Sequence, residues 1–234
     1  MVSKRWCVAM GVLWAVLPGL AHAASPVYPA GPVYPAGTVQ ALPFALRIDQ
    51  PYTAADVAAD HVTLTAPKGS DMYTDPGNGQ AVITAPRITF QADGDFIFSA
   101  RVDAGFTAQY DGAALVLYGD DQHWAKLLFE HLDDHTHGVT SSVVDPRSDD
   151  DYHVRLGEDD KQVWLKIVRA GGMIIFYMSQ DGAHWDMLRD FAFDSPAPVA
   201  IGFETQAPVG ESFTGTFSQI RFEARTFSDF WQGE

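Results

Sequence analysis

Apolar and polar residues alternate with a period of two over most of the chain after residue 41. Around 124–131, for example, Ala125, Leu127 and Phe129 share one parity, while Lys126 and Glu130 share the other. A strand with one buried face requires this alternation. The pattern recurs at 42–49, 96–103, 163–168 and 220–225. It predicts many short strands and leaves room for one short helix, over residues 53–60.

Two segments, 113–118 and 173–178, are apolar at both parities, which indicates central strands covered on both sides. Turn sequences such as Asp93-Gly94 and Gly171-Gly172 separate the runs. Near the C-terminal end the apolar positions change parity, and a bulge at Ser218-Gln219 would account for the change. About a dozen strands without a sustained helical period predict an all-β fold, a two-sheet antiparallel sandwich.

Residues 1–23 are predicted to be a secretory signal peptide. Lys4 and Arg5 precede an apolar run, and Ala21-His22-Ala23 supplies the small residues that signal peptidase needs. The run is short for a bilayer core of about 30 Å, and no second run follows, so neither a membrane anchor nor an integral membrane protein is expected. The predicted location is therefore the periplasm or the outside of the cell.

A duplicated hexapeptide follows the predicted signal, because residues 26–31 are repeated as 32–37. Its four prolines favour an extended, polyproline-like spacer. We predict a spacer over residues 24–40 and a single domain over 41–234. The alternative is a docking motif that exposes Tyr28 and Tyr34.

Charge and composition exclude several classes of partner. The 234 residues carry 15 Lys+Arg against 30 Asp+Glu, a formal charge of −15, with a pI near 4.7. Nucleic acid and anionic membrane surfaces require a basic face, so neither is an expected partner. Hydrophobic residues make up 47% of the chain, as in a globular protein. The single cysteine lies in the predicted signal, so the mature chain has no disulfide.

Several stretches between residues 60 and 227 resemble one family. They are Lys68-Gly69-Ser70-Asp71, Ala85-Pro86-Arg87, Tyr110-Asp111-Gly112-Ala113-Ala114-Leu115, Trp124-Ala125-Lys126 with Glu130, Ser142-Val143-Val144, Ser148-Asp149, and Ser179-Gln180-Asp181-Gly182 with Trp185. They are similar to the concanavalin A-like domains of unknown function related to regulation of enolase proteins and to the C-terminal domain of certain β-xylosidases. The resemblance implies a two-sheet jelly-roll with one concave face, and implies no reaction. Gly112 stands where the family has glutamine, and Asp150 where it has tryptophan.

The strand around Trp124 is the predicted centre of a ligand site. Alternation puts Trp124, Lys126 and Glu130 on one face, which the resemblance places on the concave sheet. An aromatic ring can stack on the C–H face of a sugar while charged groups bind its hydroxyls. We therefore predict a non-catalytic protein that binds carbohydrate. The predicted ligand-binding residues are Asp111, Trp124, Lys126, Glu130, Asp149 and Arg189.

Structural roles for the same residues remain open. Lys126 and Glu130 would then form an ion pair, and Trp124 would cover the sheet edge. Arg189 either pairs with Asp149 or Glu130 across strands, or clamps a ligand carboxylate. Trp185 follows a hairpin turn, and we expect it to fold back over the sheet.

Two other functions also remain open. A glycoside hydrolase needs two carboxylates about 5–9 Å apart across a groove, and Glu130 with Asp149 is the candidate pair. The strand motif Glu-x-Asp-x-x-Glu of laminarinase-like members of this fold class is absent from the sequence. The third possibility is an envelope protein-interaction domain without a small ligand, tethered by the hexapeptide repeat.

Metal binding has one candidate cluster, consisting of His131, Asp133, His135 and His137. Three imidazoles and a carboxylate are zinc ligands, but Asp133-Asp134 and Gly138 indicate a hairpin tip, where side chains point into water. The spacing also matches no established zinc motif. Acidic runs at 149–151 and 158–160 offer oxygen ligands for calcium, without a recognisable calcium loop. We predict no cofactor, with zinc or calcium as alternatives.

Overall fold

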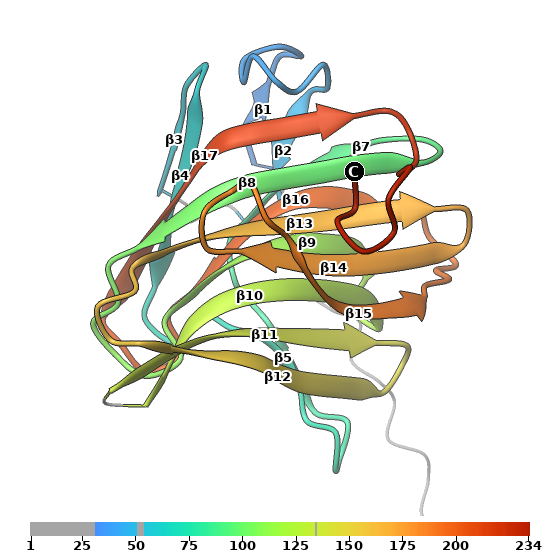
Figure 1. The fold of residues 1–234 in the computed structure, drawn as a ribbon. Coiled ribbons are helices and arrows are strands. Elements are labelled where there is room, and N and C mark those ends of the chain that lie inside the picture. The colour runs from blue at the N-terminus through green and yellow to red at the C-terminus, as the bar shows by residue number, and fades with distance from the viewer. Residues whose placement is uncertain (1–30, 51–53, 134) are drawn as a thin grey trace, which may run out of the picture.

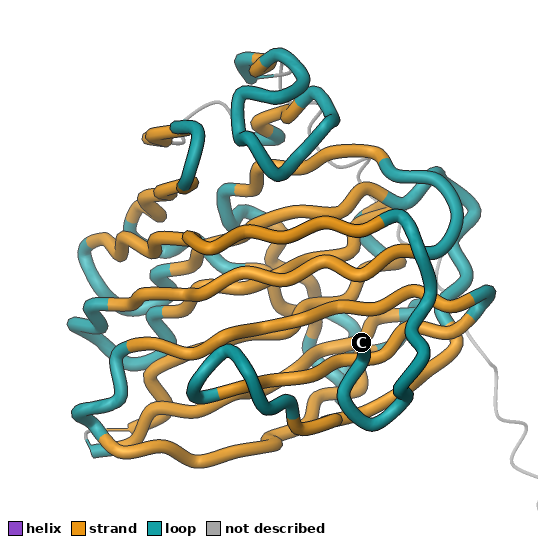
Figure 2. The backbone as a smooth tube through the Cα atoms, turned by 45° about the horizontal axis from the view of Figure 1, so that its top comes forward, coloured by secondary structure: helices purple, strands orange, loops and turns teal. Residues whose placement is uncertain are grey.

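The structure is a computed structural model that describes residues 31–234, except 51–53 and 134. The predicted signal peptide and the first residues of the predicted spacer, up to 30, lie outside the described residues. The described residues contain no helix, and strands run side by side across the whole molecule (Figure 2). Within that part of the chain, no helix is long and apolar enough to cross a membrane.

Two large antiparallel sheets pack face to face (Figure 1). In spatial order, the 8-stranded sheet contains β1 (Val33–Tyr34), β2 (Leu46–Ile48), β7 (Arg87–Gln91), β16 (Ala200–Gln206), β9 (Gly112–Asp120), β10 (His123–Asp133), β11 (Thr136–Val144) and β12 (Ser148–Gly157). The 7-stranded sheet contains β15 (Asp186–Ala192), β14 (Met173–Ser179), β13 (Gln162–Ala170), β8 (Phe96–Ala104), β17 (Ser212–Glu223), β4 (His61–Pro67) and β3 (Ala54–Val57). A separate hairpin contains β5 (Met72–Thr74) and β6 (Ala81–Ile83). The predicted all-β antiparallel sandwich is confirmed.

The core between the sheets follows the predicted alternation. Ala125, Leu127 and Phe129 of β10 are fully buried there. Across the core, the Phe203 ring of the 8-stranded sheet lies 4.8 Å, centroid to centroid, from the Phe217 ring of the 7-stranded sheet. Burying each such side chain contributes about 1.5–3 kcal/mol. This core fixes the register of β10, because a slip of one residue would turn its apolar side chains to the other face.

Strands β9 and β14 are covered on both sides, as their apolar runs predict. The β5–β6 hairpin covers the outer face of β9, where Val116 packs in one cluster with Met72. Residues 227–234 cover the outer face of β14, and the Tyr177 hydroxyl donates a hydrogen bond of 2.6 Å to the Phe230 carbonyl. Trp185 folds back over this sheet, as expected, and its ring centre lies 3.9 Å from Nζ of the buried Lys166.

Two predictions about the first part of the chain are wrong. Tyr34 of β1 pairs with Leu46 of β2, and Val39 is buried, so the second hexapeptide belongs to the domain and the spacer does not extend to residue 40. In place of a short helix within 53–60, the chain forms β3, which pairs with β4. A helix of two turns is marginal in isolation, whereas the edge of β4 offers the backbone a full set of partners.

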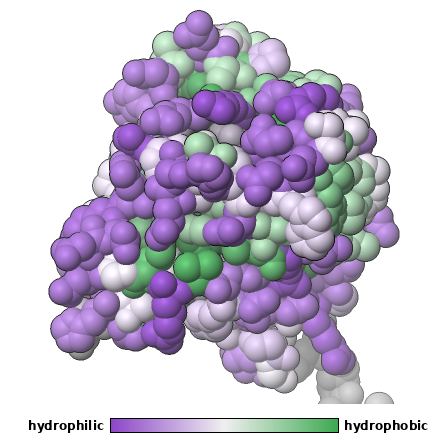
Figure 3. All heavy atoms as spheres, in the orientation of Figure 1, coloured by the Kyte–Doolittle hydropathy of each residue, from purple (hydrophilic) through white to green (hydrophobic). Residues whose placement is uncertain are grey.

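The predicted bulge in β17 is confirmed, because its register with β8 shifts between Ser218 and Arg221. Gln219 adopts a left-handed conformation there, with φ at 48°. Hydrophilic residues cover most of the face shown in Figure 3, and hydrophobic residues gather in a band across its middle. The polar character of this face agrees with the high net charge of the chain.

Candidate functional site

A cleft of about 570 Å³ lies on the outer face of the 8-stranded sheet, beside the β5–β6 hairpin. Its lining combines buried polar groups with exposed aromatic rings. The buried floor consists of Lys126, Leu128, Glu130, Thr140 and Gln206. The exposed rim includes Tyr73, Tyr110, Tyr152 and Asp150, and the half-buried Asp71 lies beside it. We call this site the tyrosine cleft.

Hydrogen bonds hold the polar floor of the tyrosine cleft in place. Lys126 donates from Nζ to Oε1 of Gln206 over 2.6 Å, and Gln206 donates from Nε2 to the Tyr110 carbonyl over 3.0 Å. Thr140 donates to Oε1 of Glu130 over 2.7 Å. Lys126 is 4% exposed and Glu130 is 7% exposed, and charged groups buried to this degree require such partners. The floor is therefore a fixed set of donors and acceptors.

Burial also changes the protonation of the acids in the cleft. It raises the pKa of Glu130, against the hydrogen bond from Thr140 and the charge of Lys126, which both lower this pKa. Burial likewise raises the pKa of Asp71, and the Lys126 charge again opposes it. A carboxyl group that keeps its proton to higher pH can donate a hydrogen bond as well as accept one.

Tyr110 is held at the cleft in a strained conformation. Its φ is 66°, in the left-handed region that non-glycine residues avoid at a cost of about 1–2 kcal/mol. Its amide donates to the His131 carbonyl over 2.8 Å, and its own carbonyl accepts the hydrogen bond from Gln206. Strain of this kind persists where the surroundings over-determine the conformation, as they often do at functional sites.

Trp124 lies on the predicted face with Lys126 and Glu130, but its ring is fully buried. The β5–β6 hairpin covers it, and the indole packs in one cluster with Met72, Val116 and Val144. The prediction that this ring is open to a ligand is therefore wrong. Alternation identified its face correctly, but the hairpin adds a layer over that part of the sheet.

Asp111 also serves a structural purpose. Its side chain is buried, and Oδ2 accepts hydrogen bonds from the amide and hydroxyl of Thr107 and from the Ala108 amide, at 2.9–3.0 Å. These bonds close the loop that leads to Tyr110. Asp111 supports one wall of the cleft and does not present its carboxylate to a ligand.

Asp149 and Arg189 pair with each other, as one reading of the sequence expects, but away from the cleft. Arg189 Nη2 lies 3.1 Å from Oδ2 of Asp149 and joins the edge strands β15 and β12 of the two sheets. Asp149 is opposite Val143, whose side chain belongs to the core between the sheets. Asp149 therefore points to the opposite side of β12 from the cleft, and the expected pairing of Glu130 with Asp149 as hydrolytic carboxylates is wrong.

The four candidate metal ligands separate into different environments. His131 and His137 face each other across β10 and β11 with ring centroids 5.2 Å apart, and His137 Nδ1 lies 2.7 Å from the Asp160 carbonyl. Asp133 pairs with Arg155, and His135 lies 3.4 Å from Glu158. In the described ranges, no three His, Cys, Asp or Glu side chains come together in a way that could hold a metal ion. The hairpin tip that the sequence predicts accounts for this separation.

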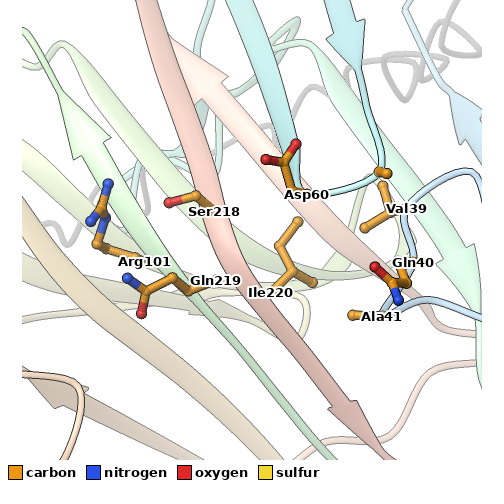
Figure 4. A pocket seen from close by; sticks show the side chains of 9 residues that line it. Val39, Gln40, Ala41, Asp60, Arg101, Ser218, Gln219 and Ile220 are labelled. Carbon is orange, nitrogen blue, oxygen red and sulfur yellow. The ribbon is translucent and has the colours of Figure 1, made fainter.

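A second depression, of about 700 Å³, lies beside the bulge of β17. Figure 4 shows Arg101 and Gln219 on one side of β17 and Gln40 on the other. Arg101 is already paired with Asp103 over 2.8 Å, and none of the described residues that line the depression is aromatic. The tyrosine cleft, with its buried charges and exposed rings, is therefore the stronger candidate site.

A known family covers most of this chain, including the whole tyrosine cleft. The model of the family described as "Protein of unknown function (DUF1349)" matches residues 48–225. The chain belongs to the DUF1349 family. Regulation of enolase protein 1 from Saccharomyces cerevisiae is 24% identical over 161 residues, which cover 69% of this chain and 80% of the yeast protein. The resemblance that the sequence motifs predict is thus confirmed.

Solved structures show the same fold at low identity. A functionally unknown protein from Saccharomyces cerevisiae has a TM-score of 0.68 at 22% identity, over 74% of this chain and 93% of the yeast chain. A xylan β-1,4-xylosidase from Bacillus halodurans has a TM-score of 0.55 at 15% identity, over 70% of this chain and 32% of the enzyme. This DUF1349 domain therefore has the concanavalin A-like sandwich that also occurs as one part of longer glycoside hydrolases.

Both departures from the family pattern fall at the cleft of this DUF1349 domain. A Cβ on Gly112 would lie 3.3 Å from Cγ of Gln206, so the glycine leaves room for an amide that β16 supplies instead. Asp150 lines the cleft where the resemblance places a tryptophan, and the neighbouring Tyr152 provides an aromatic ring on the same strand.

Several cleft residues of this DUF1349 domain were not identified from the sequence. Tyr152 and Asp150 share a parity on β12, and that alternation was a usable signal. The sequence held no comparable signal for Tyr73 or Gln206. Tyr73 lies on a separate hairpin, and Gln206 ends a strand whose residues are all buried. Only the three-dimensional arrangement of β5, β10 and β16 brings them together.

Proposed function

We propose that this protein binds carbohydrate, without cleaving it, in the tyrosine cleft. The observation that carries the proposal is the set of three exposed tyrosines, Tyr73, Tyr110 and Tyr152, around a floor of fixed polar groups. Sugar rings stack on aromatic side chains through their C–H faces, and their hydroxyls bind amide, ammonium and carboxyl groups. The cleft volume also falls within the roughly 300–1,000 Å³ that is usual for small-ligand sites.

Two further points support this proposal. The concanavalin A-like fold of this chain also occurs in a xylan β-1,4-xylosidase, an enzyme that acts on a polysaccharide. The predicted signal peptide would bring the mature protein to the periplasm or the cell exterior, where glycans are abundant. Neither point assigns a ligand, so the proposal depends on the residues of the cleft.

Tyr152 provides the first test, because it is 66% exposed and its replacement leaves the core unchanged. Tyr152→Ala is expected to weaken binding of an oligosaccharide about three- to tenfold, which corresponds to the loss of one stacking contact of about 0.5–1.5 kcal/mol. Titration calorimetry with hexamers of xylose, glucose, N-acetylglucosamine and glucosamine measures the effect. Trp231→Ala is the matched control, since Trp231 is 69% exposed on the C-terminal segment that covers the other sheet.

The same oligosaccharides distinguish binding from hydrolysis. If the cleft only binds, incubation with the protein releases no new reducing ends, and Glu130→Gln changes affinity alone. Release that disappears in Glu130→Gln would replace the binding proposal by a glycoside hydrolase with Glu130 as its acid. Equal affinity of Tyr152→Ala and the native protein for every bound hexamer would contradict the site itself.

A further inference from the structure

We infer that the ligand of the tyrosine cleft carries positive charge, and that it is an oligosaccharide of amino sugars with free ammonium groups. This inference rests on the proposed function, because it names the class of carbohydrate that the same cleft would select. It follows from the balance of charges around the cleft and from the partners that those charges already have.

Carboxylates outnumber cations in the lining. Asp71, Glu130 and Asp150 line the cleft, and among the described lining residues Lys126 is the one cation. The Lys126 ammonium is 4% exposed at the floor and already donates to Gln206. The rim that a ligand meets first is therefore negative.

The acids of the cleft also lack an ion pair at contact distance, although the charge of the nearby Lys126 acts on Asp71 and Glu130. Within the ranges that the structure describes, no Lys or Arg forms an ion pair with Asp71, Glu130 or Asp150; the acids on neighbouring surfaces, such as Asp133 and Asp149, do have one. Asp151 has the opposite parity to Asp150 on β12, and its carboxylate lies 3.7 Å from His153 on the side of the strand away from the cleft. Asp150 accepts a hydrogen bond from Ser148, which leaves its charge uncompensated.

An ammonium group matches both parts of this lining. It gains Coulomb energy from each unpaired carboxylate, more so in a cleft than in open water. It is also attracted to the faces of tyrosine rings, through the ring quadrupole. A uronic acid oligomer would meet the same carboxylates and the −15 charge of the whole chain as repulsion. A neutral oligomer would stack on the rings but leave the negative rim without a partner.

Titration calorimetry on the native protein with four hexamers tests the inference: glucosamine, N-acetylglucosamine, xylose and galacturonic acid. The glucosamine hexamer is expected to bind at least tenfold more tightly than the two neutral hexamers, and the galacturonic acid hexamer least tightly. The ratio of the affinity for the glucosamine hexamer to that for the neutral hexamers should fall as salt is raised from 50 to about 500 mM, because salt screens exposed charges.

Asp150→Asn removes one rim charge at an exposed position of an edge strand, where the fold does not depend on it. This variant is expected to lose about three- to tenfold in affinity for the glucosamine hexamer and none for the xylose hexamer. Asp159→Asn is the control, since it changes the net charge equally in the turn between β12 and β13, away from the cleft lining.

The outcomes separate the inference from the proposal on which it rests. Equal or tighter binding of a neutral hexamer, or binding of the glucosamine hexamer that neither salt nor Asp150→Asn changes, overturns the inference and leaves carbohydrate binding in place. Equal losses in Asp150→Asn and Asp159→Asn would show that net charge, and not the cleft, attracts the ligand, and would also overturn it. If none of the hexamers binds, both the inference and the proposed function are wrong.

Discussion

Replacing Trp124 by alanine is expected to lower the free energy of unfolding by about 3–5 kcal/mol. The indole is fully buried between the outer face of the 8-stranded sheet and the β5–β6 hairpin. Its removal leaves a cavity lined by Met72, Val116 and Val144, which belong to separate strands and cannot close together without loss. Urea denaturation followed by circular dichroism measures the change.

Trp231→Ala is the control for this experiment, because a ring that is 69% exposed contributes little to stability. A change within about 0.5 kcal/mol is expected for this variant. A Trp124→Ala protein that keeps the native stability but no longer binds any oligosaccharide would contradict the structure. Trp124 would then be a ligand platform, as the sequence alone predicts.

Glu204→Gln is expected to stabilise the protein at pH 8, by up to about 3 kcal/mol, and to have little effect at pH 4. Glu204 of β16 is 0% exposed, and in the described part of the chain neither carboxylate oxygen has a hydrogen-bond partner. Burial raises its pKa from 4.5 to about 7, and the nearby acids Asp71 and Glu130 add to this rise, while Lys126 and Arg87 oppose it.

The pH dependence follows from this raised pKa. Between pH 4.5 and about 7 the folded protein keeps a proton that the unfolded chain has lost, so stability falls as pH rises through this window. Below this window Glu204 is protonated in both the folded and the unfolded protein, so it does not destabilise the fold. Above the window it is ionised in both, and the full free-energy cost of burying the ionised carboxylate lowers stability. Each pH unit of the window lowers the free energy of unfolding of the native protein by about 1.4 kcal/mol, which gives the expected size of the stabilisation in Glu204→Gln.

Denaturation curves at pH 4, 6 and 8 for both proteins measure this effect. The difference in stability between the two proteins should grow from pH 4 to pH 8. Glu211→Gln, at an exposed glutamate that precedes β17 and pairs with Lys68, should change stability little at any pH. A Glu204→Gln protein that is less stable than the native protein at pH 8 would show that the ionised carboxylate has a favourable partner in solution. Our description of this buried acid would then be wrong.

The comparison of Trp124 with Lys126 shows how far the sequence alone could predict the site. Alternation is local, so it placed both residues on the correct face of β10. Exposure depends on what covers that face, and the cover over Trp124 comes from a hairpin about fifty residues earlier in the chain. No local sequence pattern indicates such a contact. The fold could therefore be predicted from alternation, whereas the exposed part of the site could not.

Asp149 and Asp150 show a second reason why the site could not be predicted from the sequence alone. They are adjacent acids on one strand, and a shift of one residue moves a side chain to the other face of a sheet. Register with β11 places Asp150 opposite Ser142 and Asp149 opposite the core residue Val143. The run of three acids at 149–151 has no apolar alternation to fix its parity, so only the pairing of β12 with β11 decides which acid faces the cleft.

Mapping a bound oligosaccharide onto the structure by nuclear magnetic resonance tests the central claim most directly. Amide resonances of a ¹⁵N-labelled domain would be followed while the glucosamine hexamer and, separately, the xylose hexamer are added. The account predicts that the largest shifts occur at Tyr73, Tyr110, Asp150 and Tyr152, and that amides around Lys166 on the opposite sheet stay unchanged. Shifts centred on the opposite sheet or on the depression beside β17, or no shifts with either hexamer, would contradict it.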